Sequence, residues 1–448
     1  MDIRFLVPIM VFAAGIYFSV ILARALIRGR AGGAKAKRVK TKGGFATLSL
    51  ALAGTLGVGN IFGVATALII GGAGSVLWLL VSAFFSAVIK YSEVSLSLSY
   101  GKSGGIPTVL KNSFGRAGGA MAKLYALFAL LLGCVMGFAL QGGSLCECLY
   151  VSFGTPPLIS SAVMAGILIY IVSGKNEKIK KFTATIIPLT TIVYIILALW
   201  IIFSNIERLP SVTLAILKDA LSVKSGVGGA VGFITSAAVR EGFCGAILSN
   251  EAGAGTSSFA HTSGEDVGAL GGVVEVIFDT LILCTLTAFA VLVSVPNIES
   301  YTSGVELVLA AVYSVLGGGG IGALSFVVAC FAVCTAVCWY YYSAECCREL
   351  FGGRGGAALM TAAVALTVIG AHTEGTYLVI ASHYLLLFLS VLSLSVLIKN
   401  SDRVINFTLS SHKMLTKDAF SNLKRRRRRK EPKGQKELPT RSFSRSQN

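Results

Sequence analysis

Two glycine-rich stretches carry the residues that could bind a small polar ligand. The first, GTLGVGN (Gly54–Asn60), lies inside the hydrophobic run from Phe45 to Ile70, and the second, VREGFCGAILSNEAGAGTSS (239–258), lies in another apolar segment. A continuous helix uses its own backbone hydrogen bonds, whereas an unwound one exposes N–H donors and C=O acceptors. Glycine permits the non-helical dihedral angles and lets a ligand approach the backbone. Both stretches therefore predict non-covalent binding by interrupted helices.

The first stretch offers opposite partial charges on the two sides of its break. A half-helix that begins near Asn60 would direct its positive end at an anionic group such as a carboxylate. The carbonyl groups of residues 53–56, where the preceding half-helix ends, would suit Na⁺. The alternative is that the glycines only allow neighbouring helices to pack closely. The second interruption favours the ligand site over that alternative.

The elements that must position these stretches are membrane-spanning helices. The chain has 448 residues, of which 54% are hydrophobic and 13% are charged, and its mean hydropathy is +0.76. This composition indicates an all-α polytopic membrane protein. About 11 apolar segments have the length needed to cross a hydrocarbon core of about 30 Å. Their predicted bounds are 6–27, 45–71, 74–98, 122–146, 157–173, 183–204, 226–257, 267–295, 319–343, 356–371 and 376–398.

The two interrupted segments stand first in two successive blocks of five segments. Matching interruptions of this kind indicate an inverted-repeat secondary transporter, with one N-terminal helix ahead of a 5+5 repeat whose first and sixth core helices are broken. The predicted organisation is an N-terminal helix and basic loop (1–44), a first repeat (45–204), an extracellular connection (205–225), a second repeat (226–398) and a basic tail (399–448).

Lysine and arginine residues set the predicted orientation, because cytoplasmic loops retain positive charge. The basic stretches alternate onto one side, so that eleven crossings place the N-terminus outside and the C-terminus in the cytoplasm of a cell whose plasma (inner) membrane holds the protein. The tail adds KRRRRRK (424–430) to a net charge of +18 and is expected to be disordered from about residue 402. Anionic lipid headgroups are its nearest partner, and no nucleic acid partner is expected.

Ionisable residues inside the apolar segments require an explanation. Lys90 and Glu93 are spaced for an i,i+3 pair at the membrane interface. Asp279 has no basic residue three or four positions away. It either supports the broken helices by hydrogen bonds or tunes a cation site, and both interpretations stay open.

Further charged residues accompany the second interruption. Arg240, Glu241 and Glu251 are predicted to cluster around it, with Asn250 and Glu251 bracing the SNEAGAG stretch as a gate. His261 and the nearby acidic residues 265 and 266 resemble a metal cluster only superficially, and a solvated loop is the expected setting.

Other chemistries find little support in the sequence. The ten cysteines lack the spacing of a zinc or disulfide framework, and most lie in apolar segments. The nucleotide-binding pattern GxxxxGK[ST] is absent, which argues against a primary pump. No nucleophile, base and orienting acid are suggested by the spacing, so we expect neither an enzyme nor a cofactor.

Four stretches together resemble the alanine or glycine:cation symporter family, the bacterial and archaeal sodium:alanine symporters. These are AGTLGVGNIFGVATALIIGGAGSVLWLLVSAFFSAVIKYSEVSLSLSY (53–100), SNEAGAGTSS (249–258), FDTLILCTLTA (278–288) and FAVCTAVCWYYYSAE (331–345). The similarity covers roughly residues 5 to 350. In fold, that family resembles the neurotransmitter:sodium symporters, which implies a 5+5 inverted repeat with one extra helix and a working monomer.

The resemblance implies two sodium sites. One lies between the first and eighth core helices and would use the backbone carbonyls of Ala53 and Leu56 with Thr335 and Cys334. The family usually has serine where Cys334 stands, and a thiol is a poor ligand for a hard cation. The other site would use Thr55, the Asn60 side chain and the substrate carboxylate.

The resemblance also implies a substrate site. The amides of Gly57, Val58 and Gly59, beside Asn60, would receive the carboxylate of an amino acid. Gln141 matches a glutamine of the third core helix, and a helix-to-helix hydrogen bond is the alternative role for it. The aromatic residues Phe243 and Trp339 would form apolar walls, although ordinary packing would explain Trp339 equally well.

The leading functional hypothesis is a secondary symporter that couples Na⁺ entry to uptake of a small neutral amino acid, such as alanine or glycine, by alternating access. One alternative is a proton-coupled or exchanging carrier. Another is a non-transporting amino-acid sensor that signals through the basic tail, which lacks a readable folded domain. The last apolar segment, 376–398, also lacks the acidic residue, methionine and Pro-Asn pair common in the family.

Overall fold

The computed structural model describes residues 2–28, 44–101, 105–174, 176–222, 236–262 and 268–411, and almost all of them are helical. Several predictions fall elsewhere in the chain. The basic loop 29–43, the first residues of the segment 226–257, residues 265 and 266, and the tail after residue 411 lie outside the described residues.

The described residues form a series of α-helices. They are α1 (Leu6–Arg28), α2 (Gly44–Thr55), α3 (Phe62–Gly71), α4 (Ser75–Ser99), α5 (Ile106–Ser113), α6 (Gly115–Leu132), α7 (Leu140–Phe153), α8 (Pro157–Val172), α9 (Asn176–Ser204), α10 (Leu209–Ala220), α12 (Ala237–Asn250), α13 (Ser257–His261), α14 (Leu270–Val276), α15 (Thr285–Ser294), α16 (Gly304–Phe351), α17 (Gly356–Gly370) and α18 (Gly375–Lys399). Two π-helical turns, η3 (Gly133–Ala139) and η5 (Ile277–Cys284), join α6 to α7 and α14 to α15.

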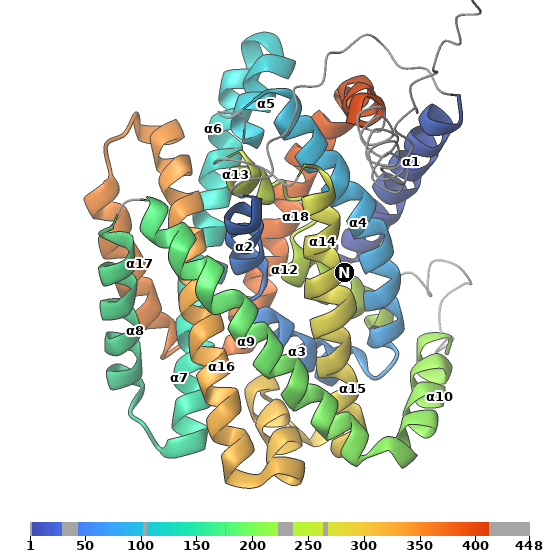
Figure 1. Cartoon of the computed structure of the whole chain (residues 1–448), viewed down its shortest axis with the longest axis vertical. Helices are drawn as coiled ribbons and strands as arrows, with labels where there is room; N and C mark the ends of the chain where they lie inside the picture. The colour runs from blue at the N-terminus through green and yellow to red at the C-terminus, as the bar shows by residue number, and fades with distance from the viewer. Residues whose placement is uncertain are drawn as a thin grey trace, which may run out of the picture.

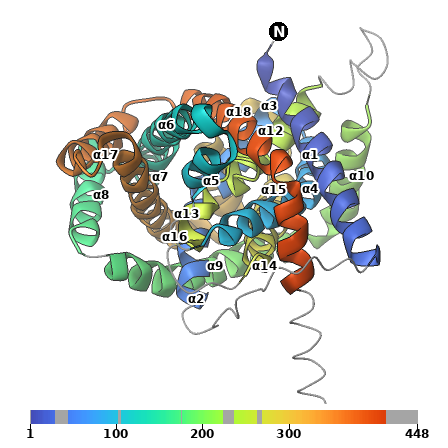
Figure 2. The same cartoon turned by 90° about the horizontal axis from the view of Figure 1, so that it is seen from above.

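The helices form one bundle with the interrupted segments inside it. Figure 1 shows α8 and α17 side by side at one edge of the bundle, with α1 and α10 toward the other. The view along the bundle in Figure 2 places α12 and α13 between these two edges. Val58 and Asn60 at the first break and Asn250 and Ala252 at the second are buried, so the unwound backbone can find protein partners.

Seven of the described helical segments are long and apolar enough to cross a membrane, or eight if the bent pair of α2 and α3 counts as one span. The other segments of the eleven predicted are shorter helices. α8 has 16 residues, α17 has 15 and α12 has 14. The structure therefore shows a polytopic helical membrane protein, and the count of eleven crossings stays a prediction.

Two helix bounds differ from the sequence-based expectation. The predicted segment 319–343 is the second part of α16, which begins at Gly304 and departs from helical geometry at Gly317 (φ 58°, ψ −152°). Residues 401–411 are helical, so the expectation of disorder from about residue 402 is wrong at its start. Val404 and Leu409 are buried there, because the helix after α18 still packs on the bundle.

The first interruption separates α2 from α3 and bends the chain by 60°. A single turn of 3₁₀-helix, η2 (Val58–Asn60), lies between them, and Gly57 has an extended conformation (φ −127°, ψ −163°). A Cβ atom at Gly57 would lie 2.8 Å from Thr335 Oγ1 and 3.0 Å from Gln141 Oε1. Glycine is needed here because α7 and α16 approach the backbone so closely.

The second interruption separates α12 from α13. Glu251 ends α12 in the left-handed region (φ 54°) and is the only residue other than glycine with positive φ among the described residues. Asn250 Oδ1 accepts a hydrogen bond from Ala252 N–H at 2.9 Å, and Tyr125 donates to the carbonyl of Ala254 at 2.7 Å. Side chains thus replace the helical hydrogen bonds lost in this connection.

The N-terminal helix is tied to the start of α12. Arg4 lies 3.4 Å from Glu241, and Glu241 also pairs with Arg240 at 2.8 Å. The Asp2 carboxylate also belongs to this group, because it lies 2.6 Å from the Arg4 guanidinium. Arg240 and Glu241 therefore do not cluster with Glu251, as the sequence suggested, because the whole length of α12 separates them.

Small residues set the close packing of α7 with α17. A Cβ atom at Gly370 would lie 2.0 Å from the carbonyl oxygen of Ala139, and one at Gly142 would lie 2.6 Å from that of Thr367. Backbone atoms of the two helices therefore touch, as in other tightly packed membrane helices.

Replacing Gly370 with alanine should push α17 away from the start of α7. We expect Gly370→Ala to reduce the free energy of unfolding by about 1–3 kcal/mol, the range for overpacking a close contact. Thermal unfolding of the purified protein in detergent would measure the change. Gly166→Ala is the matched control, because a Cβ atom at Gly166 in α8 meets nothing within 4 Å. Equal melting temperatures for the two variants would contradict the packing argument.

Candidate functional site

The bend between α2 and α3 is closed by the Asn60 side chain. Asn60 Oδ1 accepts a hydrogen bond from Gly57 N–H at 3.0 Å, and Asn60 N–H donates to the carbonyl of Gly57 at 3.3 Å. Thr287 of α15 donates to the carbonyl of Asn60 at 2.8 Å. Asn60 is fully buried, so these contacts satisfy backbone groups that the unwound turn would otherwise leave unpaired.

Gln141 approaches the same turn from α7. Val58 N–H donates to Gln141 Oε1 at 3.2 Å, while Gln141 Nε2 donates to the carbonyl of Met136 at 3.2 Å. Met136 belongs to the π-helical turn η3, whose wider turn frees a carbonyl for a side chain. Gln141 is thus fixed with its oxygen toward an amide predicted to bind the substrate, and a carboxylate would compete for that N–H.

The predicted sodium ligands of α2 and α16 are brought together in part. Thr335 donates its hydroxyl to the carbonyl of Leu56 at 3.1 Å, and both residues are buried. Cys334 and Ala53 are also fully buried. Thr55 turns its hydroxyl back toward the carbonyl of Leu52 at 3.4 Å. Oxygen atoms of Leu56 and Thr335 therefore meet beside the bend, whereas a thiol such as that of Cys334 is a soft ligand.

Asp279 lies beside Asn60 and is fully buried. The Asn60 amide donates to Asp279 Oδ1, and the Ser249 hydroxyl lies 2.8 Å from each carboxylate oxygen. Thr280 donates to Asp279 Oδ2 at 2.8 Å. Asp279 thereby links the bend after α2, the end of α12 and the π-helical turn η5, which is the hydrogen-bonding support that one of the two interpretations expected.

The second interruption is braced from within. Asn250 Nδ2 donates to Thr280 Oγ1 at 3.0 Å. Thr256 donates to one carboxylate oxygen of Glu251, while Glu251 Oε1 is buried with no hydrogen-bond partner among the described residues. The predicted bracing role of Asn250 agrees with these contacts, and its carbonyl has a further partner in α4.

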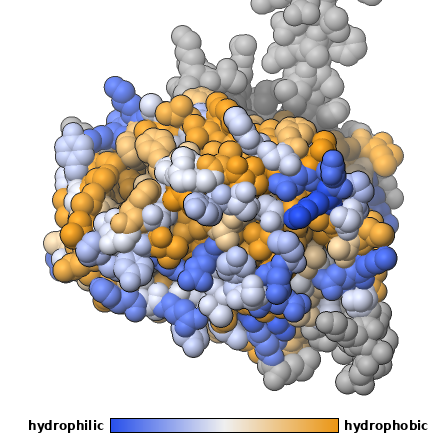
Figure 3. All heavy atoms as spheres, turned by 90° about the horizontal axis from the view of Figure 1, so that it is seen from below, coloured by the Kyte–Doolittle hydropathy of each residue, from blue (hydrophilic) through white to orange (hydrophobic). Residues whose placement is uncertain are grey.

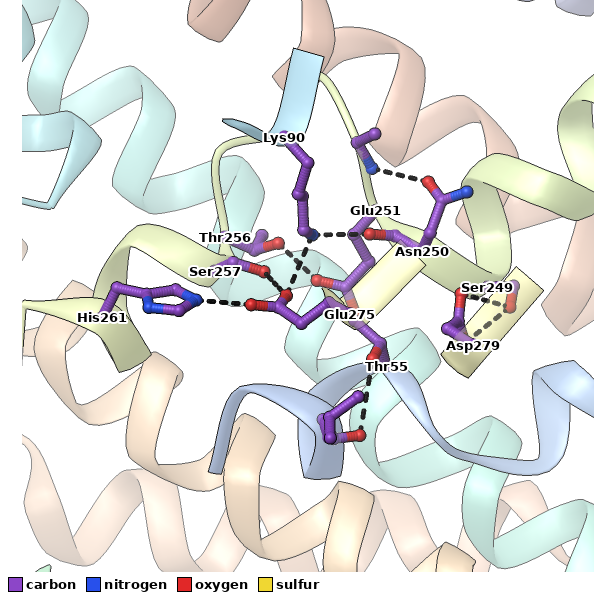
Figure 4. A network of polar contacts seen from close by, with 12 residues as sticks. Thr55, Lys90, Ser249, Asn250, Glu251, Thr256, Ser257, His261, Glu275 and Asp279 are labelled. Carbon is purple, nitrogen blue, oxygen red and sulfur yellow. Dashed lines mark hydrogen bonds and ion pairs between the residues drawn. The ribbon is translucent and has the colours of Figure 1, made fainter. Parts of the chain in front are cut away.

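Lys90 of α4 supplies that partner. Its ammonium group donates to the carbonyl of Asn250 at 2.5 Å and lies 3.7 Å from Glu275 of α14. Glu275 also accepts from Ser257 at 2.7 Å and contacts His261. Figure 4 shows Lys90, Ser257 and His261 pointing toward Glu275. The buried group fastens the end of α12 to α4, α13 and α14.

Two sequence-based predictions are corrected by this group. Lys90 and Glu93 do not form an interfacial pair, because Glu93 faces Ser393 of α18 at 3.3 Å and both charged residues are buried. His261 is fully buried against Glu275 and does not lie in a solvated loop. Sequence reasoning missed Glu275. Its charge on an otherwise apolar helix was a signal that could have found it, but only packing shows that it meets Lys90.

The two aromatic candidates lie in different surroundings. Phe243 packs on Phe12 of α1, with ring centroids 4.9 Å apart, and stacks on Trp78 of α4 at 6.4 Å. This side of α12 faces other helices, so the structure gives no support to the predicted apolar wall at Phe243. Trp339 is fully buried one turn after Thr335 and packs against Gly137 of η3 and Tyr342.

A cavity of about 390 Å³ reaches the first interruption. Val58 and Gly59 line its inner end together with Phe62 and Gly63 of α3. Its remaining lining comes from α3, α7, the first residue of α8, the start of α16 with the two residues before it, the connection between α17 and α18, and the start of α18. These residues are Thr66, Leu140, Gly143, Ser144, Glu147, Tyr150, Pro157, Thr302, Ser303, Gly304, Val305, Ala371, His372, Thr373, Glu374, Gly375, Thr376 and Val379. Figure 3 views the molecule from below and shows hydrophilic and hydrophobic residues interspersed over that face. A small solute could thus reach the Val58 and Gly59 backbone.

Comparison with known proteins agrees with this arrangement. The profile of the sodium:alanine symporter family matches residues 2–421. The putative sodium/proton-dependent alanine carrier protein YrbD of Bacillus subtilis is 31% identical, covering 69% of this chain and 68% of its own length. The sodium/alanine symporter AgcS of Methanococcus maripaludis is 29% identical, and the match covers 69% of this chain and 71% of AgcS. The probable sodium/glutamine symporter GlnT of Bacillus subtilis is 28% identical, and the match covers 75% of this chain and 73% of GlnT.

Solved transporter structures share the fold. The structure of MhsT in complex with L-phenylalanine superposes with a TM-score of 0.50 at 15% identity, covering 82% of this chain and 95% of that one. A manganese transporter mutant of Eremococcus coleocola gives a TM-score of 0.53 at 12% identity, and the superposition covers 82% of this chain and 85% of that transporter. The fold and the profile match across nearly the whole chain show that this membrane protein belongs to the sodium:alanine symporter family.

Proposed function

We propose that this protein is a secondary active symporter that couples Na⁺ entry to the uptake of a small neutral amino acid by alternating access. The observation that carries the proposal is the bend at Gly57–Asn60. There the backbone leaves helical geometry inside the bundle, meets Gln141, Asn60 and Thr335, and lies at the end of a cavity of about 390 Å³. Relatives named as alanine or glutamine carriers support an amino acid as the substrate.

The substrate carboxylate would bind the amides of Val58 and Gly59. Both residues line the cavity, and α3 begins three residues after Gly59, so the positive end of its dipole favours an anion near this point. Gln141 would then orient the ammonium or carboxylate end of the amino acid. Phe62 and Gly63 of α3 line the cavity beside these amides, and the large Phe62 side chain favours a small substrate side chain such as that of alanine.

Na⁺ would bind on the other side of the bend. The carbonyl of Leu56 and the hydroxyl of Thr335 already lie within hydrogen-bond distance, and Ala53 is the neighbouring carbonyl on α2. A second Na⁺ would use Asn60 with Thr55. Hard oxygen ligands of this type suit Na⁺, whereas the thiol of Cys334 contributes little.

The transport cycle would use the two interruptions as equivalent hinges. We propose that α2 with α3 and α12 with α13 are the broken first and sixth core helices of a 5+5 inverted repeat, and that eleven crossings place the N-terminus outside and the C-terminus in the cytoplasm. The protein would work as a monomer in the plasma membrane, with the basic tail near anionic lipids. Asn250 and Glu251 would act at the second hinge.

A proton-coupled or exchanging carrier is the second candidate, because one relative is named as a sodium/proton-dependent carrier. Uptake of radiolabelled L-alanine into proteoliposomes separates the two. With an inward Na⁺ gradient the symporter should accumulate alanine, and replacing Na⁺ by choline at a fixed membrane potential should abolish accumulation. Unchanged uptake in choline would contradict Na⁺ coupling and favour the second candidate.

Thr335→Ala should impair Na⁺-driven accumulation, because it removes a hydroxyl that contacts the Leu56 carbonyl. We expect the Na⁺ concentration for half-maximal uptake to rise about tenfold, since one lost ligand is worth about 1–1.5 kcal/mol. Uptake measured at a series of Na⁺ concentrations checks this. Thr185→Ala is the control, because Thr185 on α9 is exposed and bonds only its own helix. If uptake by Thr335→Ala and Thr185→Ala depends on the Na⁺ concentration in the same way, Thr335 is not a ligand of the proposed Na⁺ site.

Gly57→Ala should abolish uptake without unfolding the bundle. The added methyl group would lie 2.8 Å from Thr335 Oγ1, and overpacking of this kind costs about 1–3 kcal/mol, here concentrated at the bend. The measurements are L-alanine uptake and the melting temperature of the same preparation. Gly119→Ala on α6 is the control, because no atom lies within 4 Å of its Cβ position. Normal uptake by Gly57→Ala would show that the close approach at the bend is not needed for transport.

A further inference from the structure

Lys90 of α4 carries a positive charge in the interior of the bundle. Its side chain is fully buried, and its ammonium group donates to the Asn250 carbonyl at 2.5 Å and lies 3.7 Å from Glu275. Removing an ammonium group from water is costly unless the protein supplies a counter-charge and hydrogen bonds. Packing alone therefore does not explain Lys90, because an apolar side chain would fill the same space without that cost.

The helices around Lys90 are shaped to hold it. A Cβ atom at Gly272 of α14 would lie 3.0 Å from Lys90 Cγ and 3.0 Å from the Lys90 carbonyl oxygen, so glycine leaves room for the lysine stem. Ser257 of α13 donates at 2.7 Å to Glu275 Oε2, the oxygen that lies 3.7 Å from Lys90 Nζ. Figure 4 shows the Lys90 ammonium group pointing toward this carboxylate. The ammonium group is thus fixed at one place by two helices other than its own.

The carbonyl that Lys90 contacts is the negative end of a half-helix. Asn250 is the last residue of α12, and a helix leaves its last four carbonyl groups without donors from within the helix. The aligned peptide dipoles add partial negative charge at this end, which favours a cation. A lysine ammonium group, with three N–H donors and no acceptor, meets this requirement as a bound cation would.

The first interruption has the same feature without a charged side chain. Its half-helix α2 ends at Thr55, and the next carbonyl, that of Leu56, accepts from the neutral Thr335 hydroxyl at 3.1 Å. The proposed function places Na⁺ at this carbonyl. Each break therefore follows a half-helix whose last carbonyl groups favour a cation, but only the second break has a cation that is part of the chain.

We propose that Lys90 is a tethered cation that takes, at the second interruption, the place that Na⁺ takes at the first. The comparison of the two breaks rests on the proposed function, whereas the contacts of Lys90 do not. Because the ammonium group cannot leave, α12 keeps its cation throughout the transport cycle, and only the first broken helix gains and loses one. Lys90 is thus a positioning residue that acts through the backbone of α12.

The buried carboxylates near Lys90 indicate what its loss would do. Glu93, Glu251 and Glu275 are all buried, and Lys90 is near enough to interact with the charge of each. Replacing Lys90 by alanine would remove that positive charge and leave space beside the Asn250 carbonyl. Since a buried charge that has lost its partner is strongly destabilising, a small cation from solution should then bind in that space.

The cation requirement of Lys90→Ala tests the proposal. The melting temperature of the purified full-length protein in detergent is measured in choline chloride, and then as KCl or methylammonium chloride replaces it at constant ionic strength. A ligand that binds only the folded state raises the melting temperature. In choline, Lys90→Ala should melt roughly 5–10 °C below the wild type, and K⁺ or methylammonium should restore most of that difference. The wild type should not respond, because its own ammonium group fills the place.

Three variants are the controls. Lys90→Met removes the charge but fills the space, so it should melt at a low temperature in every cation. Lys90→Ala/Glu275→Gln removes both members of the buried pair and should lose the response to K⁺. Lys111→Ala removes the ammonium group of a partly exposed ion pair, 2.7 Å from Glu349, and should behave as the wild type does.

Three results would overturn the proposal. They are the same melting temperature for Lys90→Ala in choline, K⁺ and methylammonium, an equal response to K⁺ in Lys90→Met, and an equal response in the wild type. If Lys90→Ala does not fold in any cation, the double variant decides: a folded double variant identifies the missing charge as the defect, and an unfolded one contradicts it. Absence of Na⁺-driven uptake would contradict the proposed function instead, because the melting experiment requires no transport.

Discussion

Unwound backbone inside a membrane bundle must have its N–H and C=O groups paired by the protein, and the central structure of this membrane protein follows from that constraint. At the first interruption, Asn60 turns back to accept from Gly57 N–H, and Gln141 accepts from Val58 N–H. At the second, Asn250 accepts from Ala252 N–H, while Lys90 donates to the Asn250 carbonyl. Each broken helix is thus held by side chains that a continuous helix would not need.

The helices that supply those side chains are themselves modified. Gln141 follows the π-helical turn η3, and Asp279 lies within the π-helical turn η5. A π-helical turn leaves a carbonyl without its usual partner, and such turns often occur at functional sites. Met136 offers its carbonyl to Gln141, and Thr280 offers its carbonyl to Thr285 at 3.2 Å. The two π-helical turns therefore place Gln141 and Asp279, two side chains that hydrogen-bond to residues at the breaks.

The sequence predicted the existence of the interruptions, the membrane class and the family, because glycine content, hydropathy and motif are local properties. It also selected Asn60, Gln141, Thr335 and Asp279, which the structure brings around one bend. It could not predict which helix faces meet. Phe243 was assigned to the site although it packs on α1, and Lys90 was paired with Glu93 although Glu275 lies across the helix interface. Sequence spacing describes neighbours on one helix, whereas these contacts depend on how different helices pack.

The Asn60 side chain couples the first interruption to the second. Its Oδ1 accepts from Gly57 N–H, while its amide donates to Asp279 of η5 and to Ser249 near the end of α12. In a medium of low dielectric constant such buried hydrogen bonds are stronger than they would be in water. A change in the hydrogen bonding of Asp279 or Ser249 would therefore reach the turn at Val58 and Gly59 through a single side chain.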